Sequence, residues 1–172
     1  MLELEKTYLA KYIPEGLLQY PHKELIDIYL PEESTHPRLR IRKSGDKYEM
    51  TKMTKIGEDD ASQQIEQTIP LDEKEFASLE SAEGKRLRKV RYYMPYQGRT
   101  AEVDVFQDDL SGLVVVDFEF NSPEEQATFE MPDFCLVDVT QETFIAGGML
   151  CGKAYTDIEP ELNRIGYKRL TT

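Results

Sequence analysis

The chain begins its regular patterning with Leu2-Glu3-Leu4-Glu5-Lys6-Thr7-Tyr8-Leu9. Successive side chains of a β-strand point to opposite faces, so Glu3, Glu5 and Thr7 share one face and the residues between them share the other. Two carboxylates on one face are typical of a strand that faces water, and also of a metal site inside a cavity. The matching faces of the later strands decide between these interpretations.

The composition is that of one globular domain. With 172 residues, of which 40% are hydrophobic and 31% are charged, the chain is long enough for one substantial core. We therefore predict a single domain over residues 1–172. No apolar run approaches the roughly 18 residues of a membrane-spanning helix, and the N-terminus lacks a basic segment followed by an apolar one. We expect a cytoplasmic protein with no membrane partner.

The charge and the cysteine content exclude several classes of site. A net charge of −12, from 33 acidic and 21 basic residues, argues against sequence-independent binding to nucleic acid. Cys135 and Cys151 lack the spacing of a metal site and are expected to be buried thiols. His22 and His36 each neighbour a proline and have no second ligand at metal spacing, so both are expected in solvated loops.

Apolar alternation and turn residues predict eight strands. They cover residues 2–12, 24–30, 38–42, 47–54, 62–69, 85–93, 100–106 and 113–120, and Pro70 is expected to end the fifth. Apolar residues at helical spacing predict helices over 71–81, 140–150 and 158–165, with a short helical turn at 121–125. Residues 57–60 are predicted to form an acidic loop.

The strongest chemical signal lies in the third predicted strand, Arg38-Leu39-Arg40-Ile41-Arg42, which places three guanidinium groups on one face. Like charges in a row need anions to balance them. On the same period of two, Lys52 of the fourth strand is expected to join the arginines. Lys89 and Arg91 share a face of the sixth strand.

Acidic residues follow the same alternation. Glu66 lies on the fifth strand, Glu102 and Asp104 on the seventh, and Asp117 and Glu119 on the eighth. The last pair stands beside β-branched and aromatic residues, which is not typical of charges that serve only solubility.

Every predicted strand backs its charged face with an apolar face. In a sandwich with a dry interior the charges would face water and their signs would scatter freely. In a closed barrel the apolar faces pack outward and the lumen separates cation sites from anion sites. We therefore predict an α+β protein, a closed antiparallel β-barrel with a charged lumen and helices packed outside. Such a lumen suits a polyphosphate, with Arg and Lys binding phosphate oxygens and carboxylates holding hard divalent ions.

These strands resemble the CYTH domain, or triphosphate tunnel metalloenzyme, family over essentially the whole chain. The family pattern E-x-E-x-K is matched by Glu3 and Glu5, with Thr7 in place of the lysine. The pattern R-x-R is similar to Arg40-Ile41-Arg42. The pattern T-x-K is similar to Thr51-Lys52, or to Met50-Thr51-Lys52 in a shifted register.

The remaining family patterns follow in order along the chain. E-x-E, K-x-R, E-x-D, a second E-x-E and E-V-T correspond to Gln64-Ile65-Glu66, Lys89-Val90-Arg91, Glu102-Val103-Asp104, Asp117-Phe118-Glu119 and Asp138-Val139-Thr140. In the first of these only Glu66 matches. Each pattern is common by itself, but the ordered set at these spacings is specific.

The resemblance implies an eight-stranded antiparallel tunnel that binds a triphosphate-containing small molecule together with Mg²⁺ or Mn²⁺. The phosphate-binding residues that it implies are Arg40, Arg42, Lys52, Lys89 and Arg91. The metal ligands that it implies are Asp117 and Glu119, with Glu3 and Glu5 at a second ion. Glu3, Glu5 and Glu66 are implied to be catalytic, through that ion or by positioning the attacking water. Glu102 and Asp104 either join the site or only brace the basic residues, and Arg38 is expected at the tunnel mouth.

The expected chemistry is metal-assisted hydrolysis of a phosphoanhydride bond in inorganic triphosphate or a related compound. A class IV-type adenylate cyclase and a thiamine triphosphatase stay open, because both use the same grip on a triphosphate. A non-catalytic triphosphate- or polyphosphate-binding module also stays open, because Thr7, Gln64 and Asp117 depart from the family patterns. The sequence is compatible with a monomer and with a homodimer.

Overall fold

The structure is a computed structural model that describes residues 2–56 and 61–171, so the predicted acidic loop at 57–60 lies outside the described residues. The strands are β1 (Leu2–Ala10), β2 (His22–Leu30), β3 (Leu39–Ser44), β4 (Lys47–Lys55), β5 (Gln63–Leu71), β6 (Lys85–Tyr96), β7 (Arg99–Phe106), β8 (Val114–Glu119) and β9 (Cys135–Asp138). The α-helices are α1 (Glu73–Glu80), α2 (Pro123–Thr128), α3 (Gly147–Leu150) and α4 (Tyr155–Arg164). Short 3₁₀ turns are η1 (Leu17–Gln19), η2 (Asp108–Leu110) and η3 (Thr143–Ile145).

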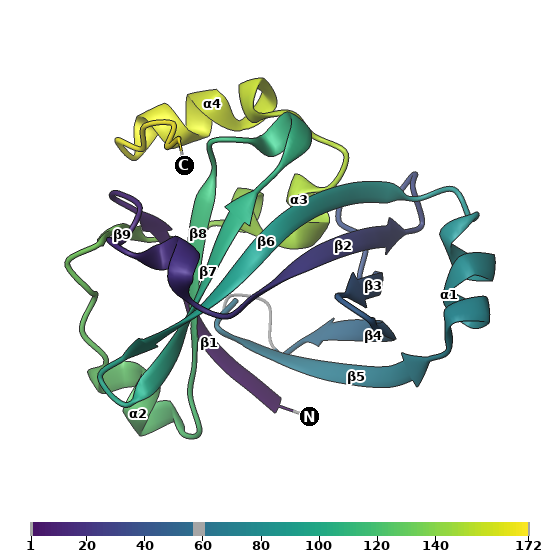
Figure 1. Cartoon of the computed structure of the whole chain (residues 1–172), viewed down its shortest axis with the longest axis horizontal. Helices are drawn as coiled ribbons and strands as arrows, with labels where there is room; N and C mark the ends of the chain where they lie inside the picture. Colours follow the sequence, from purple (N-terminus) through teal and green to yellow (C-terminus); the bar gives the residue numbers. More distant parts are fainter. Residues whose placement is uncertain (1, 57–60, 172) are drawn as a thin grey trace.

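Eight antiparallel strands close into a barrel, as predicted (Figure 1). The strand order is β5-β4-β3-β2-β6-β7-β8-β1, and the pairing of β1 with β5 closes the ring. This closure is short, with Leu2 opposite Ile65 and Glu3 opposite Gln64. Further along, β1 separates from β5 and pairs with β9 on the side away from β8.

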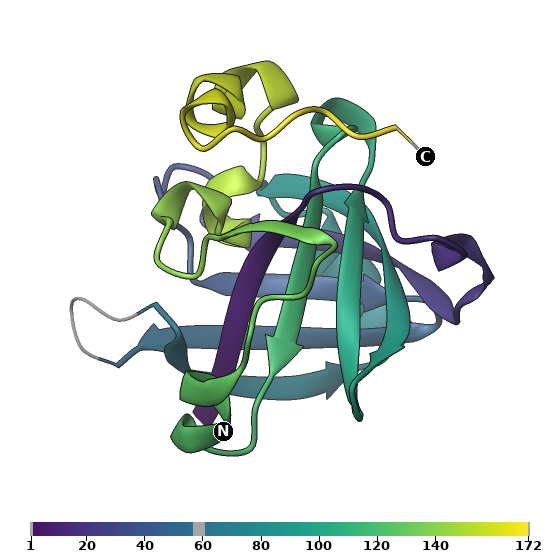
Figure 2. The same ribbon diagram turned by 90° about the vertical axis from the view of Figure 1, so that its left-hand side faces the viewer.

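The barrel interior changes from charged to apolar along several strands. On the faces that carry the charges of β1, β6, β7 and β8, the interior continues with Leu9, Leu87, Phe106 and Val115. These side chains form one buried cluster with residues of the C-terminal segment, among them Ile145, Leu150, Ile158 and Leu162. The helix α4 accordingly lies across one end of the barrel in both ribbon views (Figures 1 and 2). Apolar packing therefore fills this end, and the charged residues occupy the rest of the interior.

The outer faces of the strands are apolar and covered. A second cluster joins Leu4, Tyr8, Val116 and Phe118 to Phe129 and Phe134 of the segment before β9. On the other side, Phe76 of α1 packs on Ile28 and Ile41 from the outer faces of β2 and β3. The capping box at Asp72, whose carboxylate accepts from the backbone N–H groups of Lys74 and Glu75, begins this helix where the sequence predicts it.

The predicted helix over residues 140–150 is wrong. Only η3 and α3 form there, separated by Ala146 in an extended conformation (φ −57°, ψ 139°). The backbone at Gly147 comes so close to Tyr29 that a Cβ atom would lie 2.2 Å from the Tyr29 hydroxyl. Gly147 is the first residue of α3, and the lack of a Cβ atom permits this close approach.

The expected end of the fifth strand at Pro70 is also wrong, because β5 continues to Leu71. Pro70 pairs with Glu49 of β4, whereas β1 pairs with β5 only at its start, over Gln63 to Ile65. The missing N–H of Pro70 therefore interrupts no ladder on that side, which is where a strand tolerates proline. The first strand ends at Ala10, two residues earlier than predicted.

No helix among residues 2–56 and 61–171 is long and apolar enough to cross a membrane.

The C-terminal segment is fixed to the barrel by one buried hydroxyl. Tyr167 is 2% exposed, its Oη donates to the carbonyl of Gly112 at 2.9 Å, and it accepts from the N–H of Val114 at 2.8 Å. We expect Tyr167→Phe to lower the free energy of unfolding by about 1–3 kcal/mol, because the buried N–H of Val114 loses the acceptor Tyr167 Oη, whereas the Gly112 carbonyl still accepts from the Leu170 N–H. Urea denaturation measures this change. The control Tyr12→Phe alters an exposed tyrosine, and an equal loss in both variants would contradict the assignment.

Candidate active site

The charged part of the barrel encloses a cavity of about 390 Å³. Residues on alternating positions of the strands line it, among them Glu3, Glu5, Thr7, Asp27, Arg38, Arg40, Arg42, Gln64, Glu66, Lys89, Arg91, Glu102, Asp104, Asp117 and Glu119. The period of two therefore brings together every predicted site residue except Lys52. Among the described lining residues, carboxylates outnumber lysines and arginines by ten to six.

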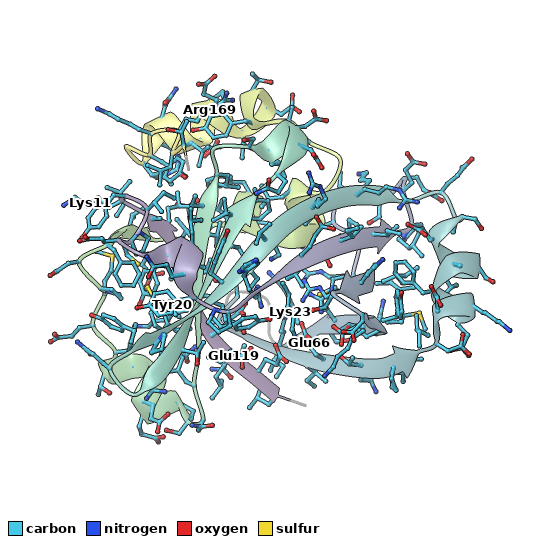
Figure 3. The ribbon with its side chains drawn as sticks, in the orientation of Figure 1. Lys11, Tyr20, Lys23, Glu66, Glu119 and Arg169 are labelled. Atoms are coloured by element: carbon cyan, nitrogen blue, oxygen red, sulfur yellow. The ribbon has the colours of Figure 1, made fainter. Side chains whose placement is uncertain are left out.

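Carboxylates of β1 and β8 form one wall of the cavity. Glu5 lies directly opposite Glu119 across the antiparallel pair, and Thr7 lies opposite Asp117. Glu66 and Glu119 belong to the two strands that flank the start of β1, and both side chains lie near the middle of the molecule in Figure 3. Like charges directly opposite each other are destabilising, so a cation bound between these carboxylates would stabilise this wall.

Burial and mutual repulsion raise the pKa values of this acidic wall. Burial, with the charges of Glu66 and Glu119, raises the pKa of Glu3 to about 7. Burial and the neighbouring Asp117 raise the pKa of Glu5, and burial and the neighbouring Asp104 raise that of Asp117. These carboxyl groups therefore hold protons more tightly than ordinary ones, as expected where cationic partners are too few.

Arg42 is held by a carboxylate that the sequence analysis did not single out. Its Nε and Nη2 atoms donate to the two oxygens of Asp27 at 2.6 and 2.7 Å. Burial alone would raise the pKa of Asp27, but the charge and hydrogen bonds of Arg42 outweigh burial and lower it to about 2. Asp27 is 1% exposed, so Arg42 is fixed in place and its charge is largely balanced.

Asp104 holds two cations of β6, Lys89 and Arg91, in the way that Asp27 holds Arg42. Its carboxylate accepts from Arg91 Nε and Nη2 at 2.7 and 2.8 Å and from Lys89 Nζ, and Arg91 also donates to Glu102. Burial would raise the pKa of Asp104, but Arg91 and Lys89 hold it well below the usual range. Asp104 and Glu102 therefore brace the basic residues, one of the two alternatives left open by the sequence.

Arg40 is held much less tightly. Its Nη2 lies 3.4 Å from the Thr51 hydroxyl and 3.9 Å from Glu66, and its buried Nε has no hydrogen-bond partner among residues 2–56 and 61–171. A buried donor without a partner is rare in proteins and points to a missing acceptor. Arg40 is thus the lumen arginine best placed to bind an added anion.

A sequence relative agrees with this arrangement. The inorganic triphosphatase of Nitrosomonas europaea is 34% identical to this chain over 145 residues, which cover 83% of this chain and 91% of that protein. The chain belongs to the CYTH, or triphosphate tunnel metalloenzyme, family. No family model matches the chain.

Solved structures show the same fold. A crystal structure of an inorganic triphosphatase superposes with a TM-score of 0.63 at 27% identity and covers 88% of this chain and 95% of that chain. A protein from Pyrococcus horikoshii, at 15% identity, superposes with a TM-score of 0.51 over 96% of this chain and 91% of that chain. The second likeness concerns the fold alone.

The structure corrects the predicted place of Lys52. Within the CYTH barrel, the face of β4 that lines the cavity carries Glu49, Met53 and Lys55, whereas Lys52 is exposed on the outer face. The sequence analysis aligned Lys52 with the arginines, and a register shift of one residue reverses the face of every side chain. Counted from Thr51, the family pattern T-x-K falls on Met53.

One further lining residue, His36, differs from its expected surroundings. His36 lies half-buried against Gly148 rather than in a solvated loop, and Arg38 Nη2 lies 3.4 Å from its Nδ1. Burial and the charges of Arg38 and Lys55 lower the pKa of His36 to about 4. No local pattern marks His36 or Asp27, but the alternation of β2 predicts that Asp27 shares a face with Tyr29.

The acidic wall offers hard oxygen donors for a divalent ion, although among residues 2–56 and 61–171 no three His, Cys, Asp or Glu side chains converge to hold one by themselves. Mg²⁺ is usually bound by one or two carboxylates that leave its other positions to phosphate oxygens and water. The opposed pair Glu5 and Glu119 fits that mode of binding.

The raised pKa of Glu3 predicts how stability depends on pH. In the folded chain Glu3 stays protonated up to about pH 7, whereas the unfolded chain releases that proton near pH 4.5. Its burial therefore lowers the free energy of unfolding progressively as the pH rises between these values. With metal chelated, we expect Glu3→Gln to raise the melting temperature by roughly 5 °C at pH 8 and to change it little at pH 5.

Differential scanning fluorimetry at the two pH values measures this effect. The control Glu15→Gln removes an exposed carboxylate and should shift the melting temperature at neither pH. A lower melting temperature of Glu3→Gln at pH 8 would count against a strained carboxylate at this position.

Proposed function

We propose that the chain is a metal-dependent triphosphatase that hydrolyses a phosphoanhydride bond of inorganic triphosphate. One observation carries this proposal. The same cavity contains Arg40, which is incompletely paired, and an acidic wall whose carboxylates repel one another and can be neutralised by cations. A polyanion with divalent ions satisfies both sides at once. The 34% identity to an inorganic triphosphatase supports the same reaction.

Arg40 makes the principal protein contact to phosphate in this proposal. Arg42, Lys89 and Arg91 add positive potential, and Arg42 keeps Nη1 free of Asp27 for a phosphate oxygen. Because their carboxylate partners hold these side chains, they need no reorganisation when negative charge develops on the phosphoryl group. Lys52, on the outer face, has no part in it.

Asp117 and Glu119, with Glu3 and Glu5 opposite or beside them, are the residues that would hold Mg²⁺ or Mn²⁺. Such an ion neutralises charge on phosphate oxygens and lowers the pKa of bound water. The fit rests on the opposed carboxylates of β1 and β8 and on the excess of acidic lining residues.

Glu3, Glu5 and Glu66 are assigned to orienting the attacking water. Glu66 is itself positioned, because its Oε1 accepts from Gln64 Nε2 at 2.9 Å. Gln64 stands where the family pattern E-x-E has its first glutamate. In this chain its amide group donates to Glu66 and holds that carboxylate in place.

An inorganic substrate suits the cavity better than an organic triphosphate. Of the described lining residues only Tyr29 and Phe106 carry a phenyl or phenol ring, and each is 4% exposed. Neither ring offers an open face on which an adenine or thiamine ring could stack. This observation favours inorganic triphosphate over the substrates of a cyclase or a thiamine triphosphatase.

The proposal is tested by phosphate release from tripolyphosphate with Mg²⁺ or Mn²⁺. We expect Arg40→Gln to lower kcat/KM at least 100-fold, since a charged group that contacts the reacting phosphate is removed. The control Lys43→Gln removes a positive charge from the outer face of the same strand and should leave kcat/KM unchanged.

Other outcomes select the other activities. Tight binding of tripolyphosphate without turnover under either metal would make the chain a binding module. Cyclic AMP formed from ATP would assign a cyclase, and faster turnover of thiamine triphosphate than of tripolyphosphate would assign that substrate.

A further inference from the structure

The cations that line the cavity fall into two groups. Arg42, Lys89 and Arg91 are paired with buried aspartates at hydrogen-bonding distance. In contrast, within residues 2–56 and 61–171 neither Arg38 nor Lys55 forms an ion pair with a carboxylate. The capacity to bind an added anion is therefore concentrated in the second group, next to Arg40.

Arg38 and Lys55 lie together at one end of the cavity, which we call the His36 end. The Met53 N–H donates to the Arg38 carbonyl at 2.9 Å, so the end of β4 runs beside Arg38. Both charges act on His36, which stays a neutral imidazole at physiological pH and touches Arg38 instead of adding a charge. Glu142 also lines this end, but it is engaged by Arg164 at 2.8 Å.

Two lysines of the family patterns are replaced by uncharged residues in this lumen. The lysines of E-x-E-x-K and T-x-K are replaced by Thr7 and Met53, and both replacements line the cavity. Lys55 lies two residues beyond Met53 on the same face of β4, and Arg38 two residues before Arg40 on the same face of β3. The lumen thus has fewer cations at its centre and two unpaired cations at the His36 end.

The row of arginines is long for a triphosphate. Arg38 and Arg42 are four residues apart, which corresponds to about 13 Å at about 3.3 Å per strand residue. Neighbouring phosphorus atoms of a linear polyphosphate are separated by roughly one such step, so three phosphate groups cover about half of the row. Lys55 is exposed to solvent, which leaves room for a chain that continues outward.

We propose that Arg38 and Lys55 form an additional phosphate subsite at the His36 end, which binds the fourth phosphate group of a linear inorganic polyphosphate. Charge-assisted hydrogen bonds from the guanidinium fork and the ammonium group recognise phosphate oxygens there. This inference rests on the proposed function for the placement of the first three phosphates, and it makes polyphosphates longer than triphosphate ligands of the same tunnel.

The test compares tripolyphosphate with linear tetrapolyphosphate, using the whole chain. Dissociation constants are measured by calorimetry with Ca²⁺ in place of Mg²⁺, for the unaltered protein, for Arg38→Gln/Lys55→Gln and for the control Lys43→Gln. We expect the double variant to weaken tetrapolyphosphate binding about tenfold and tripolyphosphate binding less than about threefold. Lys43→Gln should change neither constant, and melting temperatures check that all three proteins are folded.

Equal weakening of both ligands, or no weakening of either, would overturn the subsite, and so would a failure of tetrapolyphosphate to bind. The proposed triphosphatase fails separately, if tripolyphosphate binds but releases no phosphate with Mg²⁺ or Mn²⁺. A selective loss of tetrapolyphosphate binding would then still support the subsite.

Discussion

The carboxylate of Asp104 is the group on which the charged interior depends. It is fully buried and is shared by Lys89 and Arg91 of the neighbouring strand. Without it Arg91 would keep Glu102 and Asp117, but Lys89 would lose its ion pair in a barrel wall with too little water to solvate it, and the energetic penalty for such a charge is several kcal/mol. Arg91 of β6 and Asp104 of β7 are direct cross-strand partners. The backbone hydrogen bonds between these two strands therefore fix the positions of Arg91, Asp104 and Lys89 relative to one another. A polar lumen becomes compatible with a folded barrel through this one arrangement.

Asp27 repeats the arrangement on the opposite side of β6. It holds Arg42 across the β2–β3 pair, in which the two residues are direct cross-strand partners. The two aspartates thus fix three cations on two of the eight strands, β3 and β6, without any ligand. Fixed charges of this kind raise the electrostatic potential of the lumen and keep their orientation while a substrate reacts. The bracing groups act through the cations that they hold.

Much of this interior is predictable from sequence, because a strand has a strict period of two. Glu3, Glu5, Arg40, Arg91 and Asp117 all lie on the predicted face, and closure of the barrel follows from strands whose outer faces are apolar. The prediction for Lys52 is wrong because the period of two groups the side chains of β4 into two faces without showing which face is inward, and a shift of one residue reverses the face. The helix predicted over 140–150 is wrong because the extended backbone at Ala146 divides the segment into η3 and α3, which the spacing of apolar residues does not show. Neither the partner of Asp27 nor the freedom of Arg40 can be read from spacing, since both depend on which side chain lies opposite in space.

The charges that remain after these pairings explain how stability and ligand binding are linked. Groups that are paired inside the wall neutralise one another and have little left to offer a ligand. The carboxylates of β1 and β8 repel one another, whereas within residues 2–56 and 61–171 the cations at the start of β3 and the end of β4 form no ion pair with a carboxylate. A ligand that carries both signs, a polyphosphate with its divalent ions, relieves that repulsion and pairs those cations, and binding to the folded state alone raises stability by mass action. The repulsion among the lumen carboxylates and the affinity of the lumen for such a ligand therefore have the same origin.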